Sequence, residues 1–484
     1  MGAGLSGVEA AWFLAERGVQ VHLFESKAIS PNPAQKCSTY AELVCTNSLK
    51  SMVAESAHGM LKTEMDMMGS IVLKIGRETA VPAGDALAVD REKFSMMMTA
   101  VLKNNPNIKT HDLDVTDPLK LKTDYAADHV IIATGPLTSE GLTSWLIENL
   151  TGSDDFYFYD AIAPVVDADT LDYSKLYFKE RHKEVVKNTA TNQEGEDYET
   201  STGADYLNAP MNEEEYQRFI YELVNAEKVP PKNFEEYKFF ESCLPIDTMA
   251  ERGPETARFS CMKPIGLEKP DGTLAHAVVQ LRKENLLGSA YNMVGFQTRL
   301  TYKEQLRVFR MIPGFEKAEF IHLGSVHRNS FLNAKNLLRS DLSAMKFPEL
   351  TFAGQMTGVE GYTESAAIGL YAGMQVYLKL NQLSSAPFPL ETTVGSLINY
   401  LMTVPKPMPS NINVGIMPAV TLTKEERRRR HEIKKTKKRK IAVRAIEVLK
   451  PFIADLNNLC PSLNLRALPE VELNIQSSTL SGQE

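Results

Sequence analysis

The chain has 484 residues, of which 43% are hydrophobic and 24% charged, a composition typical of a globular protein that buries a sizeable core. No apolar stretch approaches the roughly 18 residues of a membrane span, and we expect no signal peptide. Five cysteines without a CxxC pair argue against a disulfide framework and a zinc ribbon, so we expect a reducing cytoplasm and no metal site.

The net charge of −8 is distributed unevenly. Residues 424–440, which we call the basic segment, contain eleven lysines or arginines against three glutamates, a local charge of +8 that leaves −16 on the rest of the chain. An acidic body with one basic segment is the pattern of a localised contact with a polyanion. A solvated helix face explains the same charges, and charge alone favours that simpler interpretation.

Residues 2–25 predict a turn, a helix and a strand in that order. The spacing of Gly2, Gly4 and Gly7 matches the dinucleotide fingerprint, whose glycines permit a tight turn, a close approach to pyrophosphate and close helix–strand packing. Glu25 ends the following strand and is expected to accept hydrogen bonds from a ribose. This fingerprint normally follows a strand, whereas Gly2 directly follows Met1. We therefore expect the central strand of the sheet to be absent from this sequence.

The middle of the chain predicts a strand, a loop and a second domain. Residues 129–135 (HVIIATG) indicate a buried strand that ends in a turn at Gly135. Residues 183–204 are polar and lack periodicity, so we interpret them as a mobile surface loop. From residue 206 to about residue 328, amphipathic helices and strands are separated by proline and glycine, which indicates another domain.

A second glycine-rich region follows the strand predicted at residues 350–355. Gly354, Gln355, Gly358 and Gly361 precede a helix rich in small residues, as in two-domain FAD enzymes whose late helix faces the flavin ring. Close helix packing explains the small residues equally well. We also expect Glu360 and Glu364 to share a face of this helix.

These elements predict an α/β fold, in which a doubly wound, Rossmann-like FAD-binding domain carries an inserted smaller α/β domain. We assign residues 1–165 and 329–420 to the FAD-binding domain and residues 166–328 to the insertion. Residues 421–484 are expected to form a basic helix and a C-terminal tail.

Several sequence strings resemble the bacterial folate- and FAD-dependent tRNA (uracil-5-)-methyltransferases, over nearly the whole chain. They are residues 42–49 (ELVCTNSL), 82–91 (PAGDALAVDR), 205–211 (DYLNAPM), 240–246 (FESCLPI), 262–267 (MKPIGL), 291–298 (YNMVGFQT), 327–329 (HRN) and 352–367. The resemblance implies that reduced FAD passes a one-carbon unit from methylenetetrahydrofolate to C5 of a T-loop uridine (position 54), with NADPH or NADH as reductant. It implies tRNA as the partner and a cytoplasmic location, and we infer no stable protein partner.

The same chemistry requires a nucleophile, because C5 of uracil reacts only after a thiolate adds at C6. Cys45 and Cys243 lie in the family-like strings and are the expected catalytic residues, although the sequence leaves open which of them attacks the base. For Cys37, Cys261 and Cys460 we prefer inert packing.

Other polar residues are expected to bind substrates. Asn292, Gln297, His327 and Arg328 are candidates to line a pocket for folate or the target base. Lys263 is a candidate for folate carboxylate or tRNA phosphate, although a surface salt bridge is an equally good account. Arg429, Lys435 and Lys438 are expected on one continuous basic helix that attracts the tRNA backbone.

Two other functions remain open at this point. One is a flavin oxidoreductase or hydroxylase that acts on a small molecule, for which the basic segment is incidental. The other is a non-catalytic tRNA-binding flavoprotein.

Overall fold

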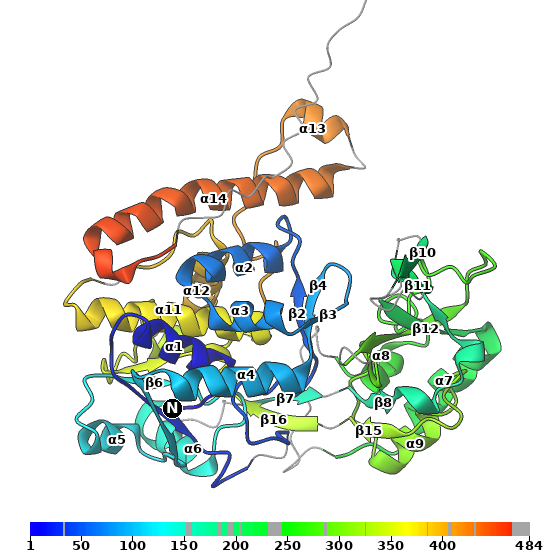
Figure 1. The fold of residues 1–484 in the computed structure, drawn as a ribbon, viewed down its shortest axis with the longest axis horizontal. Coiled ribbons are helices and arrows are strands. Elements are labelled where there is room, and N and C mark those ends of the chain that lie inside the picture. Colours follow the sequence, from blue (N-terminus) through cyan, green and yellow to red (C-terminus); the bar gives the residue numbers. More distant parts are fainter. Residues whose placement is uncertain are drawn as a thin grey trace, which may run out of the picture.

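The computed structural model describes residues 1–31, 34–151, 157–161, 163–181, 186–191, 197–202, 205–230, 244–284, 288–324, 326–384, 386–404, 409–429 and 432–466. The chain forms a larger and a smaller body with separate hydrophobic cores (Figure 1). The larger core takes its buried residues from 1–146 and 332–465, and the smaller core from 166–318. This arrangement confirms the predicted α/β class, and we keep the domain limits at 166 and 328 as a proposal.

The larger body contains helices on both sides of short parallel strand pairs. Its elements are α1 (Leu5–Ala15), β1 (Val21–Glu25), β2 (Ser48–Ser51), α2 (Ala57–Met68), α3 (Ile71–Glu78), β3 (Ala80–Val81), β4 (Ala86–Val89), α4 (Arg91–Asn104), β5 (Ile108–Asp112), α5 (Pro118–Asp124), β6 (Val130–Ile132), α6 (Glu140–Leu146), α10 (Ala334–Leu337), β17 (Leu350–Phe352), α11 (Tyr362–Leu380), α12 (Thr393–Thr403), α13 (Lys424–Arg428) and α14 (Ile433–Leu459). Strand β1 pairs in parallel with β5, and β6 with β17. β2, β3 and β4 form a separate antiparallel sheet.

The two parallel pairs are connected through the first residues of the chain. The N–H of Gly2 donates to the carbonyl of Phe24 at 2.8 Å, and the N–H of Ala133 donates to the carbonyl of Met1 at 2.9 Å. Met1 therefore stands where the central strand of such a sheet ends, with a cavity of about 290 Å³ beside it between β1 and β6. The turn of the fingerprint is therefore held from both sides.

Helices α1 and α11 pack closely because α11 carries glycines at the contact. A side chain at Gly369 would overlap the backbone of Ser6, and one at Gly373 would lie 3.3 Å from the backbone of Ala10. The small residues of α11 thus fix the position of α1, whose N-terminus starts at the predicted fingerprint.

The smaller body is a six-stranded sheet with order β15-β8-β14-β13-β12-β9, against which helices pack. Its elements are β8 (Val165–Asp167), β9 (Tyr177–Phe178), β10 (Val186–Thr191), β11 (Asp197–Thr202), β12 (Tyr206–Met211), α7 (Glu213–Asn225), α8 (Ile246–Arg252), β13 (Ala277–Lys283), β14 (Ala290–Met293), α9 (Tyr302–Phe309) and β15 (Phe320–His322). A ribbon of β7 (Tyr157–Ala161) and β16 (Val326–Ser330) lies between the two bodies (Figure 1).

The prediction of a mobile surface loop at 183–204 was wrong for residues 186–191 and 197–202, and the rest of that range lies outside the described residues. Residues 186–191 and 197–202 pair as the antiparallel hairpin β10–β11. Both strands contain β-branched valine or threonine, residue types that favour strands.

The prediction of one continuous basic helix was also wrong. Helix α13 ends at Arg428, Arg429 has non-helical dihedral angles (φ −82°, ψ 66°), and α14 begins at Ile433. Arginines clustered at this point repel one another along a helix, which favours a break there. Further along, α14 packs onto the larger core through buried side chains at helical spacing, Ile441, Ala445, Leu449, Ile453 and Leu456. Among the described residues, no helix has the length and apolarity that a membrane crossing requires.

Candidate functional site

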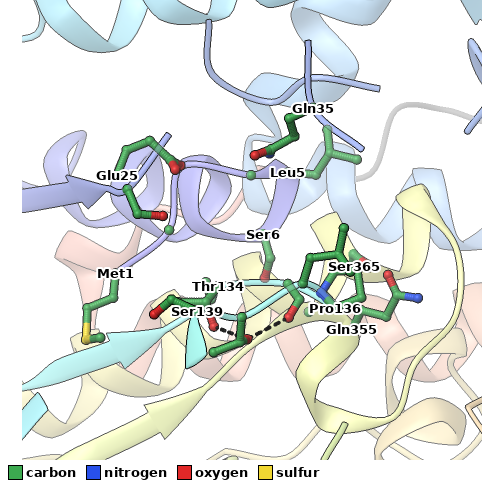
Figure 2. Close-up of a pocket in the computed structure, with 18 of the residues that line it drawn as sticks. Met1, Leu5, Ser6, Glu25, Gln35, Thr134, Pro136, Ser139, Gln355 and Ser365 are labelled. Carbon is green, nitrogen blue, oxygen red and sulfur yellow. Dashed lines mark hydrogen bonds between the residues drawn. The ribbon is translucent and has the colours of Figure 1, made fainter. Parts of the chain in front are cut away.

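A cavity opens where α1 begins, next to the carboxyl ends of β1, β5 and β6 (Figure 2). We call it the glycine cavity. It is lined by Gly2, Gly4, Leu5 and Ser6 at the start of α1, by Glu25, Leu113, Asp114 and Val115 after β1 and β5, by residues 133–139 after β6, and by Gly354, Gln355, Tyr362 and Ser365. Open α/β sheets bind their ligands at this edge.

The three glycines of the fingerprint have different surroundings. Gly2 adopts φ 88°, and an added side chain would overlap the carbonyl of Ala133. A side chain at Gly7 would overlap the carbonyl of Gly2, so this glycine allows α1 to meet the turn. At Gly4, by contrast, an added methyl group would meet no atom within 4 Å, and φ is −75°. The fold itself accepts alanine at Gly4, so a glycine there suits a ligand that passes close to the backbone.

Glu25 lies at the end of β1 and lines the glycine cavity, although only 8% of it is exposed. Its carboxylate accepts hydrogen bonds from the N–H of Ala3 at 2.7 Å and from the N–H of Lys27 at 3.0 Å. Each carboxylate oxygen has a further lone pair, which leaves acceptor capacity for the hydroxyls of a ribose. The open space at Gly4 and the acceptor capacity of Glu25 thus fit a dinucleotide.

The second glycine region contributes only part of its predicted contacts to this cavity. Gly354 and Gln355 line it after β17, as does Gly135 after the neighbouring strand β6. A side chain added at Gly358 would instead lie 3.3 Å from Leu401, and one added at Gly361 would overlap the carboxylate of Glu364. Neither lines the cavity, so their contact with a cofactor stays a prediction.

Glu360 and Glu364 do not share a helix face, contrary to our expectation. Glu360 comes before Gly361, the N-cap of α11, and accepts a hydrogen bond from Nε2 of Gln355 at 3.0 Å. Glu364 is fully buried in the first turn of α11, with Oε1 3.2 Å from Nδ1 of His58. Because α11 begins at Tyr362, after its N-cap Gly361, Glu360 lies outside the helix.

Cys45 lies in a half-buried coil between Ala41 and β2 and is connected to the glycine cavity by Tyr362. The N–H of Cys45 donates to the phenol oxygen of Tyr362 at 2.6 Å, and the N–H of Thr46 donates to the same oxygen at 3.3 Å. Burial raises the pKa of Tyr362 far above its usual value, so the phenol keeps its proton at neutral pH.

Cys243 lies outside the described residues. The residues that follow it are placed, because the N–H of Ile246 donates to the carbonyl of Gln297 at 2.7 Å. Gln297 therefore contacts the segment that leaves Cys243, while its half-buried side chain remains a candidate for substrate contact.

The other substrate candidates lie in the smaller body and the ribbon. Asn292 is 3% exposed and pairs across strands with Arg282, and its Nδ2 has no hydrogen-bond partner among the described residues. Lys263 lies in a turn with its side chain exposed, and its backbone carbonyl accepts a hydrogen bond from Nη2 of Arg181. The backbone of His327 and Arg328 lies in β16, opposite residues 160 and 159 of β7.

The basic segment presents its charge at the surface, and Figure 1 shows α13 and the start of α14 above the larger body. Its exposed side chains include Arg427, Arg428, Arg429, Lys434, Lys435, Lys437 and Lys438. Lys440 and Arg429 form ion pairs within the segment, Lys440 with Glu426 at 2.7 Å and Arg429 with Glu432 at 3.7 Å. The described residues contain no group of three or more metal-ligating side chains.

Sequence reasoning missed the residues that connect separate segments. Tyr362 followed a glycine we had singled out, but nothing local indicated that its hydroxyl would reach Cys45. Residues 113–115 had no motif, although the end of a strand that pairs with β1 is a place where cavity residues are expected.

Known proteins match this sequence along most of its length. A family model described as "Glucose inhibited division protein A" matches residues 1–384. Relatives named "Methylenetetrahydrofolate--tRNA-(uracil-5-)-methyltransferase TrmFO" are 44% identical over 457 residues in Desulfitobacterium hafniense and 45% identical over 460 residues in Enterococcus faecalis. Each alignment covers 94% of this chain and 98% of the relative. Crystal form II of Aquifex aeolicus GidA matches in fold with a TM-score of 0.59 and 18% identity, over 84% of this chain and 67% of that chain.

Proposed function

Because this chain belongs to the TrmFO methylenetetrahydrofolate--tRNA-(uracil-5-)-methyltransferases, within the wider GidA family, we propose that it forms 5-methyluridine at position 54 of the tRNA T-loop. It is an enzyme of the methyltransferase class, with methylenetetrahydrofolate as carbon donor and FAD as cofactor. We further propose that NADPH or NADH supplies the electrons, that tRNA is the macromolecular partner and that the reaction takes place in the cytoplasm.

The glycine cavity is the proposed FAD site. The open position at Gly4 admits a pyrophosphate to the backbone, and the N-terminus of α1 favours its negative charge. Glu25 would accept hydrogen bonds from the ribose, and Gly354 and Gln355 line the opposite wall. Bound FAD would supply the redox chemistry that turns the transferred one-carbon unit into a methyl group.

Cys45 is the proposed nucleophile or its partner, with Cys243 as the second thiol. The observation that carries this proposal is the phenol of Tyr362, which lines the glycine cavity and accepts the N–H of Cys45 at 2.6 Å. A thiol placed there can add to C6 of a uridine that has left its stack and make C5 nucleophilic. Asn292, with its unpartnered buried amide, is a candidate to donate a hydrogen bond to a substrate carbonyl.

The basic segment supports a role in tRNA attraction. Its exposed arginines and lysines lie without aromatic side chains among them, so they suit contacts to phosphates rather than stacking on bases. Glu426 neutralises only Lys440 within hydrogen-bond distance, which leaves Arg427 and Lys435 exposed for phosphate.

The test combines the visible spectrum of the purified protein with turnover on unmodified tRNA. We expect flavin absorbance, and 5-methyluridine when methylenetetrahydrofolate and NADPH are both supplied. A colourless protein that methylates tRNA with S-adenosylmethionine would overturn the proposal. A yellow protein without tRNA affinity would favour an oxidoreductase, and a yellow protein that binds tRNA without turnover would favour a non-catalytic flavoprotein.

A further inference from the structure

The coil that carries Cys45, residues 43–47, is held by the smaller body on the side that follows the thiol. Nε of Arg282 donates to Oδ1 of Asn47 at 2.8 Å, and Nη2 of Arg282 donates to the hydroxyl of Thr46. In return, Nδ2 of Asn47 donates to the carbonyl of Lys283 at 2.8 Å. Asn47 is fully buried and Arg282 is 7% exposed, so these bonds are shielded from water.

The same strand end also holds the side that precedes the thiol. Nη1 of Arg91 donates to the carbonyl of Leu43 at 3.0 Å. Nη2 of Arg91 donates to the carboxylate of Glu284 at 2.9 Å, and the two side chains form an ion pair whose shortest N–O distance is 2.7 Å. Glu284 directly follows β13 and stands two residues after Arg282. Both sides of the Cys45 coil are therefore attached to the end of β13.

A coil of this kind depends on tertiary contacts for its conformation, because it has no ladder of its own hydrogen bonds. Arg282 supplies such contacts at a cost, since burial of a guanidinium is unfavourable unless hydrogen bonds offset it. Those bonds go to a hydroxyl one residue after Cys45 and to an amide two residues after it. An uncharged side chain of similar volume would be enough to pack this part of the core, so packing alone does not account for an arginine here.

We propose that Arg282 is a positioning residue that sets the location of the Cys45 thiol, so that the thiol is in place only when the smaller body is docked on the larger one. The inference rests on the proposed function for its catalytic consequence. Its structural part, the dependence of the thiol on Arg282, stands without it.

The test is Arg282→Met, with Arg310→Met as the matched control. Arg310 belongs to the same body and bonds the carbonyl of Ala318, away from Cys45. We expect kcat to fall about 100-fold, as for a misplaced reacting group, with KM for tRNA and flavin content near the wild-type values. The rate at which iodoacetamide alkylates Cys45, followed by peptide mass spectrometry, should change about fivefold. Cys37, which is exposed, serves as the internal reference.

Wild-type values of both kcat and Cys45 alkylation in Arg282→Met would overturn the proposal, as would a loss of kcat with unchanged alkylation. Should Arg282→Met fail to fold, Arg282→Lys keeps the charge but not the paired geometry, and an intermediate kcat and alkylation rate are expected. Unchanged alkylation and kcat in that variant would again contradict the proposal. If the wild type methylates no tRNA while Arg282→Met still alters Cys45 alkylation, the proposed function fails and the positioning role stands.

Discussion

Two glycines at the start of α1 differ in what requires them: the fold requires Gly7, whereas Gly4 is required only by the proposed cofactor. At Gly4 an alanine meets no protein atom within 4 Å and has an ordinary φ, whereas at Gly7 it would overlap the carbonyl of Gly2. We expect Gly4→Ala to weaken FAD binding at least about tenfold while the thermal midpoint of the apoprotein stays unchanged. Gly7→Ala should lower that midpoint, because packing strain of this kind costs about 1–3 kcal/mol.

Flavin fluorescence titration and thermal scans of the two apoproteins check this pair. Full FAD affinity in Gly4→Ala would show that no ligand passes close to that backbone. An unaltered midpoint in Gly7→Ala would mean that the contact between α1 and the turn can relax.

Glu9 gives the stability of the protein a definite pH dependence. It accepts hydrogen bonds from the N–H groups of Ile71 and Val72 at the start of α3, and burial raises its pKa from 4.5 to about 8. Between these values the folded state binds one proton more than the unfolded state. The free energy of unfolding should therefore fall as pH rises from 4.5 to 8, by up to about 1.4 kcal/mol per pH unit.

Urea unfolding of wild type and Glu9→Gln across this pH range measures the effect. The glutamine cannot titrate, so the difference in unfolding free energy between the two proteins should change with pH in this window and level off above it. A constant difference would show that Glu9 is already ionised in the folded protein. Glu64, which caps α12 and whose pKa burial raises to about 7, contributes the same sign in both proteins.

At this scale the sequence predicts what is local. The spacing of Gly2, Gly4 and Gly7, and an acid at the end of the next strand, identified one wall of the glycine cavity because consecutive residues of one turn, helix and strand build it. The bonds from Arg282 to Asn47 and from Cys45 to Tyr362 connect residues 235 and 317 positions apart. A local sequence pattern cannot predict hydrogen bonds between residues so far apart in the chain, so only the folded structure reveals them.

Among the elements, α14 offers the clearest test of tRNA attraction. We expect the triple variant Lys434→Ala, Lys435→Ala and Lys438→Ala to weaken tRNA binding at low salt. The slope of log affinity against log salt should become shallower by about 0.9 for each phosphate that the variant no longer neutralises.

Filter binding or fluorescence anisotropy across a salt series provides the measurement. The matched control replaces three exposed lysines elsewhere, Lys120, Lys303 and Lys317, with alanine. Equal slopes in both triple variants would show that the basic segment makes no specific contribution.

The elements also show where sequence patterns mislead. The β10–β11 hairpin was mistaken for a loop because its residues are polar, although the threonines in both strands and the valine in one of them favour extended backbone. The break after Arg428 was missed because lysine and arginine are good helix formers one at a time. Repulsion among neighbours is a collective effect that single-residue preferences do not contain.

On the scale of the whole molecule, two cores predict two unfolding events. The larger core contains α1, β1 and α11, which surround the glycine cavity, whereas the smaller core contains none of its lining residues. We expect calorimetry to resolve two transitions. FAD should raise the temperature of the larger body's transition alone. At a concentration 100 times its dissociation constant it adds about 2.7 kcal/mol to the unfolding free energy of that body.

Scans of the apoprotein and the FAD complex check this expectation, and Arg282→Met provides a further comparison. The variant should move the two transitions apart, since it removes bonds between the bodies. One transition that shifts as a whole with FAD would show instead that the bodies unfold as a single cooperative unit.

The general architecture was within reach of the sequence, because glycine turns at both ends of the larger body frame an insertion with its own apolar pattern. The way the two bodies meet was not, since no local pattern in β7, β16 or the end of β13 indicates the segment with which each of them pairs.

Helix α14 carries both core side chains and the exposed lysines of the basic segment, which limits the truncations that the protein can tolerate. Its later turns bury Leu449, Ile453 and Leu456 in the larger core, while its first turns expose the lysines. Any deletion from the carboxyl end removes core side chains before it reaches a single lysine of that first stretch. The tRNA attraction that we propose for these lysines can thus be altered only by point substitutions that leave α14 packed on the larger core.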